Sequence, residues 1–279
     1  MKTVWKISLI EIVGLLRSTK IIVLALFVIF VNIQIITPLR SLSAAMGHRL
    51  SVLEPFAAIG NSGLVVLILP FFFMTMMADF PKDGVSRYFC RIRCSKRTWV
   101  MGQILYAVES SVLMTLFTLA SSVIMSADFI SFATPDYSYA VTKYVSTFPE
   151  RSGEYVVNLI PENLYNQIPL PVATLHTALL LILYFIMLSL IILIFSLLKK
   201  KTAGLFTDAA IIISGAVACA GRTAYMWILP MSHTITWLHY TEYQRSPVLP
   251  LYNSYIYFII ADLALIIPAV LISRRCDGI

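Results

Sequence analysis

Six long apolar stretches most constrain how this chain of 279 residues can fold. A helix needs about 20 residues to cross a hydrocarbon core about 30 Å thick. The stretches that approach or exceed this length are 21–38, 58–78, 99–125, 170–198, 203–221 and 251–272. Only 13% of the residues are charged, whereas soluble domains carry about 25%, so a soluble globular fold is excluded. We predict an all-α membrane protein with six transmembrane helices in one domain over residues 1–279.

The positive charges predict the orientation of these helices, because short loops rich in Lys and Arg stay in the cytoplasm. With both termini cytoplasmic, the cytoplasmic pieces hold all but six of the 21 Lys and Arg residues. Those six are Arg40, Arg49, Lys143, Arg151, Arg222 and Arg245. This distribution accounts for the net charge of +7, so we expect no nucleic-acid partner.

Three segments outside the spans have their own patterns. Residues 1–18 place apolar residues at helical spacing, which predicts an N-terminal helix lying in the inner interface. Residues 126–169 are acidic and rich in Tyr and Pro, and we expect them to pack as an extracellular cap. The aromatic residues of 222–250 favour broken or re-entrant helices at the outer interface. Within the second span, Pro70 is the candidate position of a bend.

A polar segment at residues 79–98 interrupts the apolar pattern and carries six Lys and Arg residues. Apolar and aromatic side chains are interleaved with these charges. They are Phe80, Val85, Tyr88, Phe89 and Ile92. This mixture is typical of a surface helix that docks on a soluble partner. An ordinary cytoplasmic loop that only fixes the topology is the alternative.

Acidic residues inside the spans are the second group of candidates. A carboxylate at the bilayer centre costs about 2.5 to 3.5 kcal/mol, so it should face protein or a wet cavity. Glu109 and Asp262 could line a substrate path with Asn32 and Gln34. Alternatively, each acid is protonated and hydrogen-bonded to a neighbouring helix. We interpret Asp208 as an acid at a helix start near the headgroups.

Common catalytic and nucleotide-binding signatures are absent from the sequence. There is no G-x-x-x-x-G-K-[ST] phosphate loop, no H-E-x-x-H, no G-x-S-x-G and no G-x-G-x-x-G. The spacing of His233, His239 and Glu242 matches no zinc motif, so we interpret them as polar interface residues and expect no metal. Two other functions stay open: an intramembrane hydrolase that uses these residues with Glu109, and an ion- or proton-coupled carrier that uses Glu109 and Asp262.

The order of these parts resembles the ABC-2 family of ATP-binding-cassette transporter permeases, the membrane subunits of bacterial exporters. Glu11 and residues 15–20 are similar to that family's entry helix. Residues 79–84 and 93–103 resemble its cytoplasmic coupling helix and the start of its third span. Pro230 is a weaker match to its external break before the last span. The interfacial helix, six spans and basic loop after span two agree with the family's layout.

This resemblance implies a type V exporter-like fold in a bacterial plasma membrane, as a dimer of identical or related permease subunits. Each subunit would grip one soluble ABC ATPase, which binds ATP and Mg, so this chain would hold no cofactor. The exported substrate would be a peptide, an antimicrobial compound or a lipid-like amphiphile, and membrane lipid would surround the spans. The residues implied to contact the ATPase are Phe80, Asp83, Val85, Arg87, Tyr88, Phe89, Ile92, Arg93 and Arg97.

Overall fold

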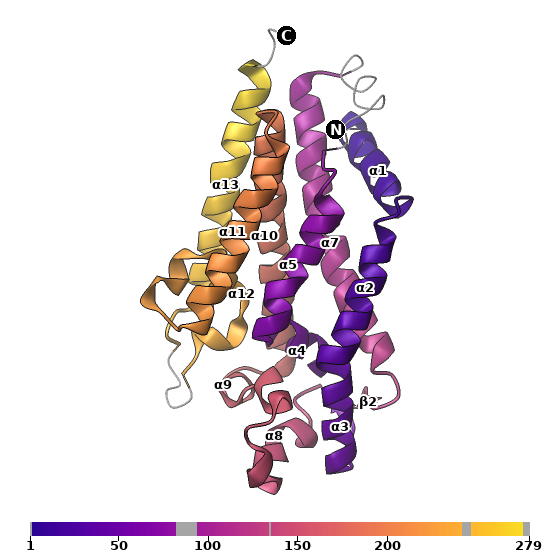
Figure 1. Cartoon of the computed structure of the whole chain (residues 1–279), viewed down its shortest axis with the longest axis vertical. Coiled ribbons are helices and arrows are strands. Elements are labelled where there is room, and N and C mark those ends of the chain that lie inside the picture. The colour runs from indigo at the N-terminus through magenta and orange to yellow at the C-terminus, as the bar shows by residue number, and fades with distance from the viewer. Residues whose placement is uncertain (1, 82–93, 134, 242–246, 276–279) are drawn as a thin grey trace.

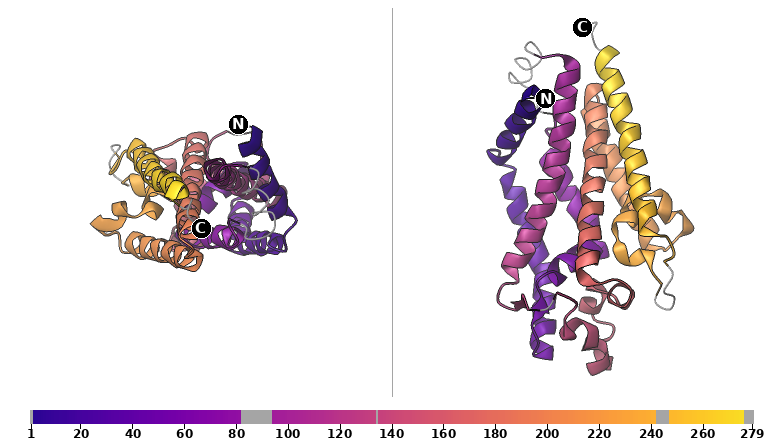
Figure 2. Two further views of the ribbon diagram at one scale, coloured as in Figure 1. Left: turned by 90° about the horizontal axis from the view of Figure 1, so that it is seen from above. Right: turned by 180° about the vertical axis from the view of Figure 1, so that it is seen from behind.

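The computed structural model describes residues 2–81, 94–133, 135–241 and 247–275, and this part of the chain is mostly helical. Long helices run side by side as an elongated bundle, and short helices cover one end of it (Figures 1 and 2). In chain order the elements are α1 (Lys2–Leu16), α2 (Ile21–Val31), η1 (Asn32–Ile36), α3 (Thr37–Met46), β1 (Leu50–Ser51), α4 (Glu54–Asn61), α5 (Gly63–Met77), α7 (Lys96–Met125), β2 (Ile130–Ser131), α8 (Tyr139–Thr147), η2 (Pro149–Arg151), η3 (Tyr155–Leu159), α9 (Glu162–Tyr165), α10 (Leu170–Leu197), α11 (Lys201–Ala220), η4 (Ala224–Ile228), α12 (Pro230–Thr234), η5 (Thr236–His239) and α13 (Leu251–Arg275).

Five helical segments are long and apolar enough to cross a membrane, so the chain is mostly helical, as predicted, and compatible with a membrane protein. They are Ile21–Met46, Lys96–Met125, Leu170–Leu197, Lys201–Ala220 and Leu251–Ile272. The bent pair α4–α5 is the sixth candidate. The start of α1, the start of α7 and the end of α13 lie at one end of the bundle, which we call the inner end (Figure 1). We call the opposite end the outer end; its side of a membrane remains a prediction.

The first span is longer than the predicted 21–38 because the helix continues through Pro38. Proline lacks a backbone N–H, and its ring clashes with the carbonyl four residues earlier in a regular α-helix. The π-helix η1 changes the backbone hydrogen-bond pattern just before Pro38, so that the Thr37 N–H donates to the Asn32 carbonyl. Thr37 Oγ1 donates to the same carbonyl at 2.9 Å. The helix then continues as α3 and ends at Gly47, whose φ of 65° suits glycine.

The second span is broken in two, and the break does not lie at Pro70, the candidate position of a bend. Helices α4 and α5 meet at an angle of 84°. The break lies at Ser62, whose ψ of 119° is extended, within a run of weak helix formers over 60–63. Pro70 lies inside α5 without ending it. A proline removes one helical hydrogen bond, whereas an extended residue redirects the whole chain.

Helix α1 packs along α7 near the inner end (Figure 1). The two helices approach so closely at Gly102 that a Cβ there would lie 2.7 Å from Ile7 Cγ2. The opposite face of α1 is exposed and apolar, with Trp5 59% exposed. A helix over most of residues 1–18 is therefore confirmed. Its depth in a membrane stays a prediction.

Helix α10 forms the centre of the bundle. In its most apolar stretch 67% of the residues are buried, compared with 17–39% in the other four long spans. Its neighbours are α4, α7, α11 and α13, and the view from above places it among them (Figure 2). The stacked rings of Phe185 and Phe73, 4.4 Å apart, join it to α5. The remaining spans keep an outward apolar face that suits lipid.

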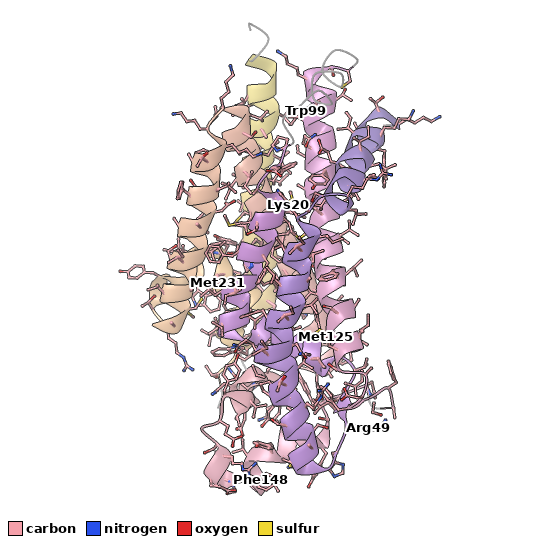
Figure 3. All side chains as sticks on the ribbon, turned by 45° about the vertical axis from the view of Figure 1, so that its right-hand side comes forward. Lys20, Arg49, Trp99, Met125, Phe148 and Met231 are labelled. Atoms are coloured by element: carbon pink, nitrogen blue, oxygen red, sulfur yellow. The ribbon has the colours of Figure 1, made fainter. Side chains whose placement is uncertain are left out.

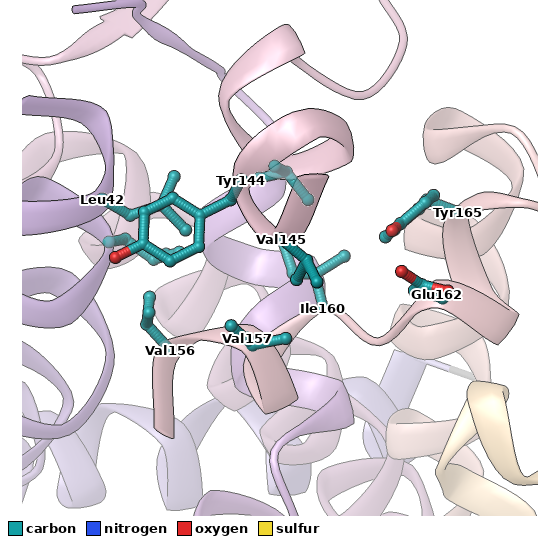
Figure 4. Close-up of a pocket in the computed structure, with 10 residues that line it drawn as sticks. Leu42, Tyr144, Val145, Val156, Val157, Ile160, Glu162 and Tyr165 are labelled. Carbon is teal, nitrogen blue, oxygen red and sulfur yellow. The ribbon is translucent and has the colours of Figure 1, made fainter. Parts of the chain in front are cut away.

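The predicted cap over residues 126–169 is an ordered set of short helices at the outer end (Figure 1). Strand β2 at its start pairs in parallel with β1, with Leu50 opposite Ile130. Arg40 of α3 forms an ion pair with Asp128, with Nε 3.1 Å from Oδ2. A pocket with an empty volume of about 330 Å³ lies between α3, α8, η3 and α9 (Figure 4). Its lining includes Leu42, Tyr144, Val145, Val156, Ile160 and Tyr165.

Glu54, at the start of α4, holds the cap to the bundle. Its side chain is fully buried. One carboxylate oxygen accepts the Ser51 N–H at 2.7 Å, and the other accepts the Ser138 N–H at 2.6 Å. Two backbone amides from separate parts of the chain are thereby satisfied by one side chain. The broken helix and the cap therefore form one connected unit.

Candidate functional site

The polar segment 79–98 is described only at its two ends. Seven of the residues expected to contact an ATPase lie outside the described residues: Asp83, Val85, Arg87, Tyr88, Phe89, Ile92 and Arg93. Phe80 is 3% exposed and therefore faces the interior of the chain. Arg97 is exposed in the first turn of α7. The Ser95 hydroxyl caps this turn by accepting the Thr98 N–H at 3.2 Å.

Asp79 and Phe80, which begin the polar segment, are anchored near α5, α7 and the elbow between α1 and α2. The Phe80 ring packs against Tyr106 of α7, with the ring centroids 5.2 Å apart. Lys20, in the elbow between α1 and α2, pairs with Asp79 at 2.7 Å and donates to the Met76 carbonyl at 3.2 Å (Figure 3 labels Lys20). A pocket with an empty volume of about 270 Å³ adjoins these contacts and is also lined by Glu11, Leu15 and Ser18. The entry to the polar segment is thus tied to α5, to α7 and to the elbow between α1 and α2.

The four residues expected to line a substrate path do not converge. Ser8 of α1 donates a hydrogen bond to Glu109, so this acid has a partner on a neighbouring helix. Asn32 is exposed on η1, and Gln34 is half-buried. Asp262 is buried in α13. No hydrogen bond in the described part of the chain joins any two of these four side chains.

Two other acids are more deeply buried than Glu109. Asp208 is 0% exposed and Asp262 is 7% exposed, so Asp208 faces protein, and its depth relative to the headgroups stays a prediction. The reason is that α11 packs against α10, where a Cβ on Gly204 would lie 2.8 Å from Phe195 Cβ. Within the described residues, both oxygens of Asp208 and Oδ1 of Asp262 have no hydrogen-bond partner. A proton, a cation or a polar substrate group would be stabilised at such positions.

Two histidines from the aromatic segment meet around a serine of α13. His233 Nδ1 lies 2.8 Å from Ser254 Oγ, and His239 Nε2 lies 3.4 Å from the same oxygen. Glu242 lies outside the described residues. Among the residues described, no group of three or more His, Cys, Asp or Glu could hold a metal ion. His233 and His239 are thus hydrogen-bonded to α13 through Ser254, and the expectation that they hold no metal stays a prediction.

The sequence did not predict the contact between the break in the second span and the aromatic segment 222–250. Trp237 donates its backbone N–H to Asn61 Oδ1 at 3.3 Å and its indole N–H to the Asn61 carbonyl at 2.9 Å. Asn163 Nδ2 donates to the Trp237 carbonyl at 3.0 Å. The sequence signal available was the run of Gly, Asn and Ser over 60–63, which separates two apolar stretches. This contact joins the α4–α5 break to the outer segment that follows α11.

No family model, curated protein or solved structure matches the chain.

Proposed function

We propose that this chain is the permease subunit of an ABC exporter. It moves a peptide, an antimicrobial compound or a lipid-like amphiphile with energy from ATP that a separate ATPase subunit hydrolyses. The apolar helices supply the membrane domain, and the missing phosphate loop requires a partner for ATP hydrolysis. Since the chain has no catalytic signature of its own, it acts as a transporter subunit rather than an enzyme.

The observation that carries this proposal is the anchoring of the polar segment at its entry. Asp79 and Phe80 contact Lys20 and Tyr106, which belong to the α1–α2 elbow and to α7. A force applied by a partner to residues 82–93 would therefore reach several helices at once. Phe80 then acts as an internal anchor, while exposed Arg97 is placed to meet an acidic partner surface. A loop that only fixed topology would need no such anchoring.

A second permease subunit is the other partner in this proposal. Asn32 is exposed between Ile29 and Ile33, which are 55% and 59% exposed, on the first long span. An amide facing lipid leaves its hydrogen-bonding groups unsatisfied, whereas an amide facing a neighbouring helix can pair. The face that carries Asn32 is therefore a suitable contact for an identical or related subunit.

Co-purification tests the coupling role. The tagged chain, isolated from its native membrane, is expected to carry a soluble protein with a phosphate loop. Replacing Phe89 and Arg93 together by Asp should release that protein. The matched control is Leu198→Asp with Lys200→Asp, which changes one exposed apolar and one exposed basic residue in the α10–α11 loop. If the Phe89/Arg93 variant retains the partner as well as the control does, the coupling assignment is refuted.

An ion- or proton-coupled carrier is the second candidate, favoured by three buried carboxyl oxygens, both of Asp208 and Oδ1 of Asp262, that have no hydrogen-bond partner among the described residues. It predicts that Asp208→Asn or Asp262→Asn abolishes transport while the chain still expresses and reaches the membrane. The ABC exporter proposal predicts instead that transport stops when the phosphate-loop lysine of the partner ATPase is replaced. Intact transport in both Asn variants, at normal expression, would remove the carrier from consideration.

A further inference from the structure

The pocket between α3, α8, η3 and α9, which we call the cap pocket, has an apolar floor (Figure 4). Seven of its ten lining residues are aliphatic, and five of these seven are buried. The seven are Leu39, Leu42, Val141, Val145, Val156, Val157 and Ile160. Its empty volume of about 330 Å³ is at the small end of the range of about 300–1,000 Å³ for ligand pockets. The cap pocket therefore suits one extended side chain rather than a whole lipid.

Tyr144 closes one side of the cap pocket with its ring. Its hydroxyl donates to Glu154 Oε2 at 2.8 Å, and Glu154 Oε1 lies 3.8 Å from Arg151 Nε. Neither Glu154 nor Arg151 lines the pocket, so these two charges neutralise each other outside it. What Tyr144 offers to a ligand is the wall of its ring, which accepts an aliphatic chain or a cation.

A carboxylate stands at the exposed side of the cap pocket. Glu162, in the first turn of α9, is exposed, and Tyr165 lies one turn further on. Figure 4 shows the oxygens of both side chains at the same side of the pocket, and the Tyr165 hydroxyl interacts with Glu162. Among the described residues, no Lys or Arg pairs with Glu162, and none lines the pocket. This end of an otherwise apolar pocket is therefore suited to a cation.

The charge of the whole cap favours a cationic ligand as well. Residues 126–169 hold five Asp and Glu residues but only two Lys and Arg residues, Lys143 and Arg151. Lys143 is exposed on α8 and does not line the cap pocket. An excess of one sign of charge raises the local concentration of ions of the opposite sign. Cations should therefore gather near Glu162 before one enters the pocket.

We propose that the cap pocket binds the side chain of a lysine residue in a peptide. The four-carbon stem lies along the aliphatic floor, and the ammonium group meets the Glu162 carboxylate beside Tyr165. Lysine suits both parts, because its stem buries along apolar surface while its charged head stays in water. An acidic side chain would be repelled by Glu162. That the lysine belongs to a peptide rests on the proposed function, whereas the pocket and its chemistry do not.

A bound lysine would also connect two distant parts of the chain. The floor of the cap pocket includes residues of α3, the end of the first span, whereas Glu162 belongs to α9. The next residue of α9, Asn163, donates to the Trp237 and Tyr240 carbonyls at 3.0 Å each. Occupation of the pocket would therefore hold the first span and the segment that follows α11 together through α9.

Binding of two matched probes to the whole chain in lipid nanodiscs tests the proposal. One probe is Nα-acetyl-lysine N-methylamide, and the other is its norleucine analogue, which keeps the four-carbon stem and lacks the ammonium group. Saturation-transfer difference NMR gives the dissociation constants, with empty nanodiscs as the blank. We expect the lysine probe to bind about tenfold more tightly, which is what one hydrogen bond to a charged group supplies.

Three variants separate the carboxylate from the apolar floor. Glu162→Gln keeps the size of the side chain and removes its charge, so it should weaken binding of the lysine probe about tenfold and leave the norleucine probe unchanged. Glu150→Gln is the matched control, because Glu150 is an exposed carboxylate of the cap that does not line the pocket. It should change the affinity by less than about twofold. Val145→Phe, which fills the pocket from α8, should weaken binding of both probes.

Absence of binding by the lysine probe, or equal affinity of the two probes for the wild type, would overturn the proposal. Equal affinity would mean that the pocket binds by apolar contact alone, as it would an acyl group. An unchanged affinity of the lysine probe for Glu162→Gln would overturn it too. These measurements need neither transport nor an ATPase, so their failure is distinct from failure of the proposed function.

A second measurement uses the wild-type chain and needs no variant. In the bound lysine probe, the methylene protons of the side chain should receive more saturation than the acetyl methyl group, because the stem is the buried part. The reverse order would refute the placement of the stem in the cap pocket.

Discussion

Gly60→Ala tests the close approach of α4 and α10. A Cβ built on Gly60 would lie 2.0 Å from Thr177 Cγ2, well inside van der Waals contact. Thr177 cannot turn away freely, because it is fully buried and its Oγ1 lies 3.0 Å from Thr236 Oγ1. Overpacking of this kind costs about 1–3 kcal/mol. The better helix propensity of alanine offsets at most about 1 kcal/mol of this cost, so the free energy of unfolding should fall by about 1–2 kcal/mol.

Thr177→Ser should restore most of that loss. This change deletes the Cγ2 methyl and keeps the hydroxyl that contacts Thr236. The remaining neighbours of the new Cβ, Thr177 Cβ at 3.4 Å and Oγ1 at 3.7 Å, are at ordinary contact distance. The double variant should therefore show a favourable coupling energy of about 1 kcal/mol or more. Gly63→Ala is the matched control, because a Cβ there meets nothing within 4 Å.

The assay is equilibrium unfolding in mixed detergent micelles, followed by circular dichroism. It compares the wild type, Gly60→Ala, Thr177→Ser and the double variant as a double-mutant cycle. Gly60→Ala should lower the free energy of unfolding in the wild-type background and change it little beside Thr177→Ser. Gly63→Ala should lie within about 0.5 kcal/mol of the wild type. Equal losses from Gly60→Ala in both backgrounds would refute the reasoning, because the clash with Cγ2 would then not exist in the folded chain.

Three further predictions concern single contacts. Glu54→Ala leaves two buried backbone N–H groups without their acceptor and should lower the free energy of unfolding by about 2–5 kcal/mol. Limited proteolysis should then cleave the cap faster than in the wild type. Asn61→Ala removes the acceptor of the Trp237 N–H and should raise hydrogen exchange in residues 236–241, while leaving α8 unchanged. Lys20→Ala should change the free energy of unfolding by less than about 1 kcal/mol, because its partner Asp79 is 68% exposed.

The sequence predicts the long helices well because a run of apolar residues needs no tertiary information to be recognised. Their interruptions are harder to predict. At Pro38 the chain escapes the clash by a local π-helix, which depends on the exact hydrogen-bond pattern of the preceding turn. At Ser62 the break is stabilised by Trp237 and Tyr155, which are distant in sequence. Propensity alone favours a bend at Pro70, and tertiary contacts place it elsewhere.

For the candidate site residues too, the sequence predicts the residue types, and tertiary contacts decide their partners. Glu109 and Asp208 are both acids within a span, and their positions in the sequence do not reveal that one has a serine partner while the other has none among the described residues. That difference comes from which helix packs beside each acid. His233 and His239 each contact Ser254, which belongs to another helix, so no spacing rule could have predicted their arrangement.

The two ends of the bundle are built differently, and this difference bears on how the molecule could move. At the inner end, contacts among Lys20, Asp79, Phe80 and Tyr106 tie the polar segment to α5, α7 and the elbow between α1 and α2. At the outer end, the α4–α5 break meets three short helices through hydrogen bonds to backbone groups. Helix α10 passes between these ends as a continuous buried rod. A displacement at the inner end would therefore be carried along the long helices to the breaks at the outer end.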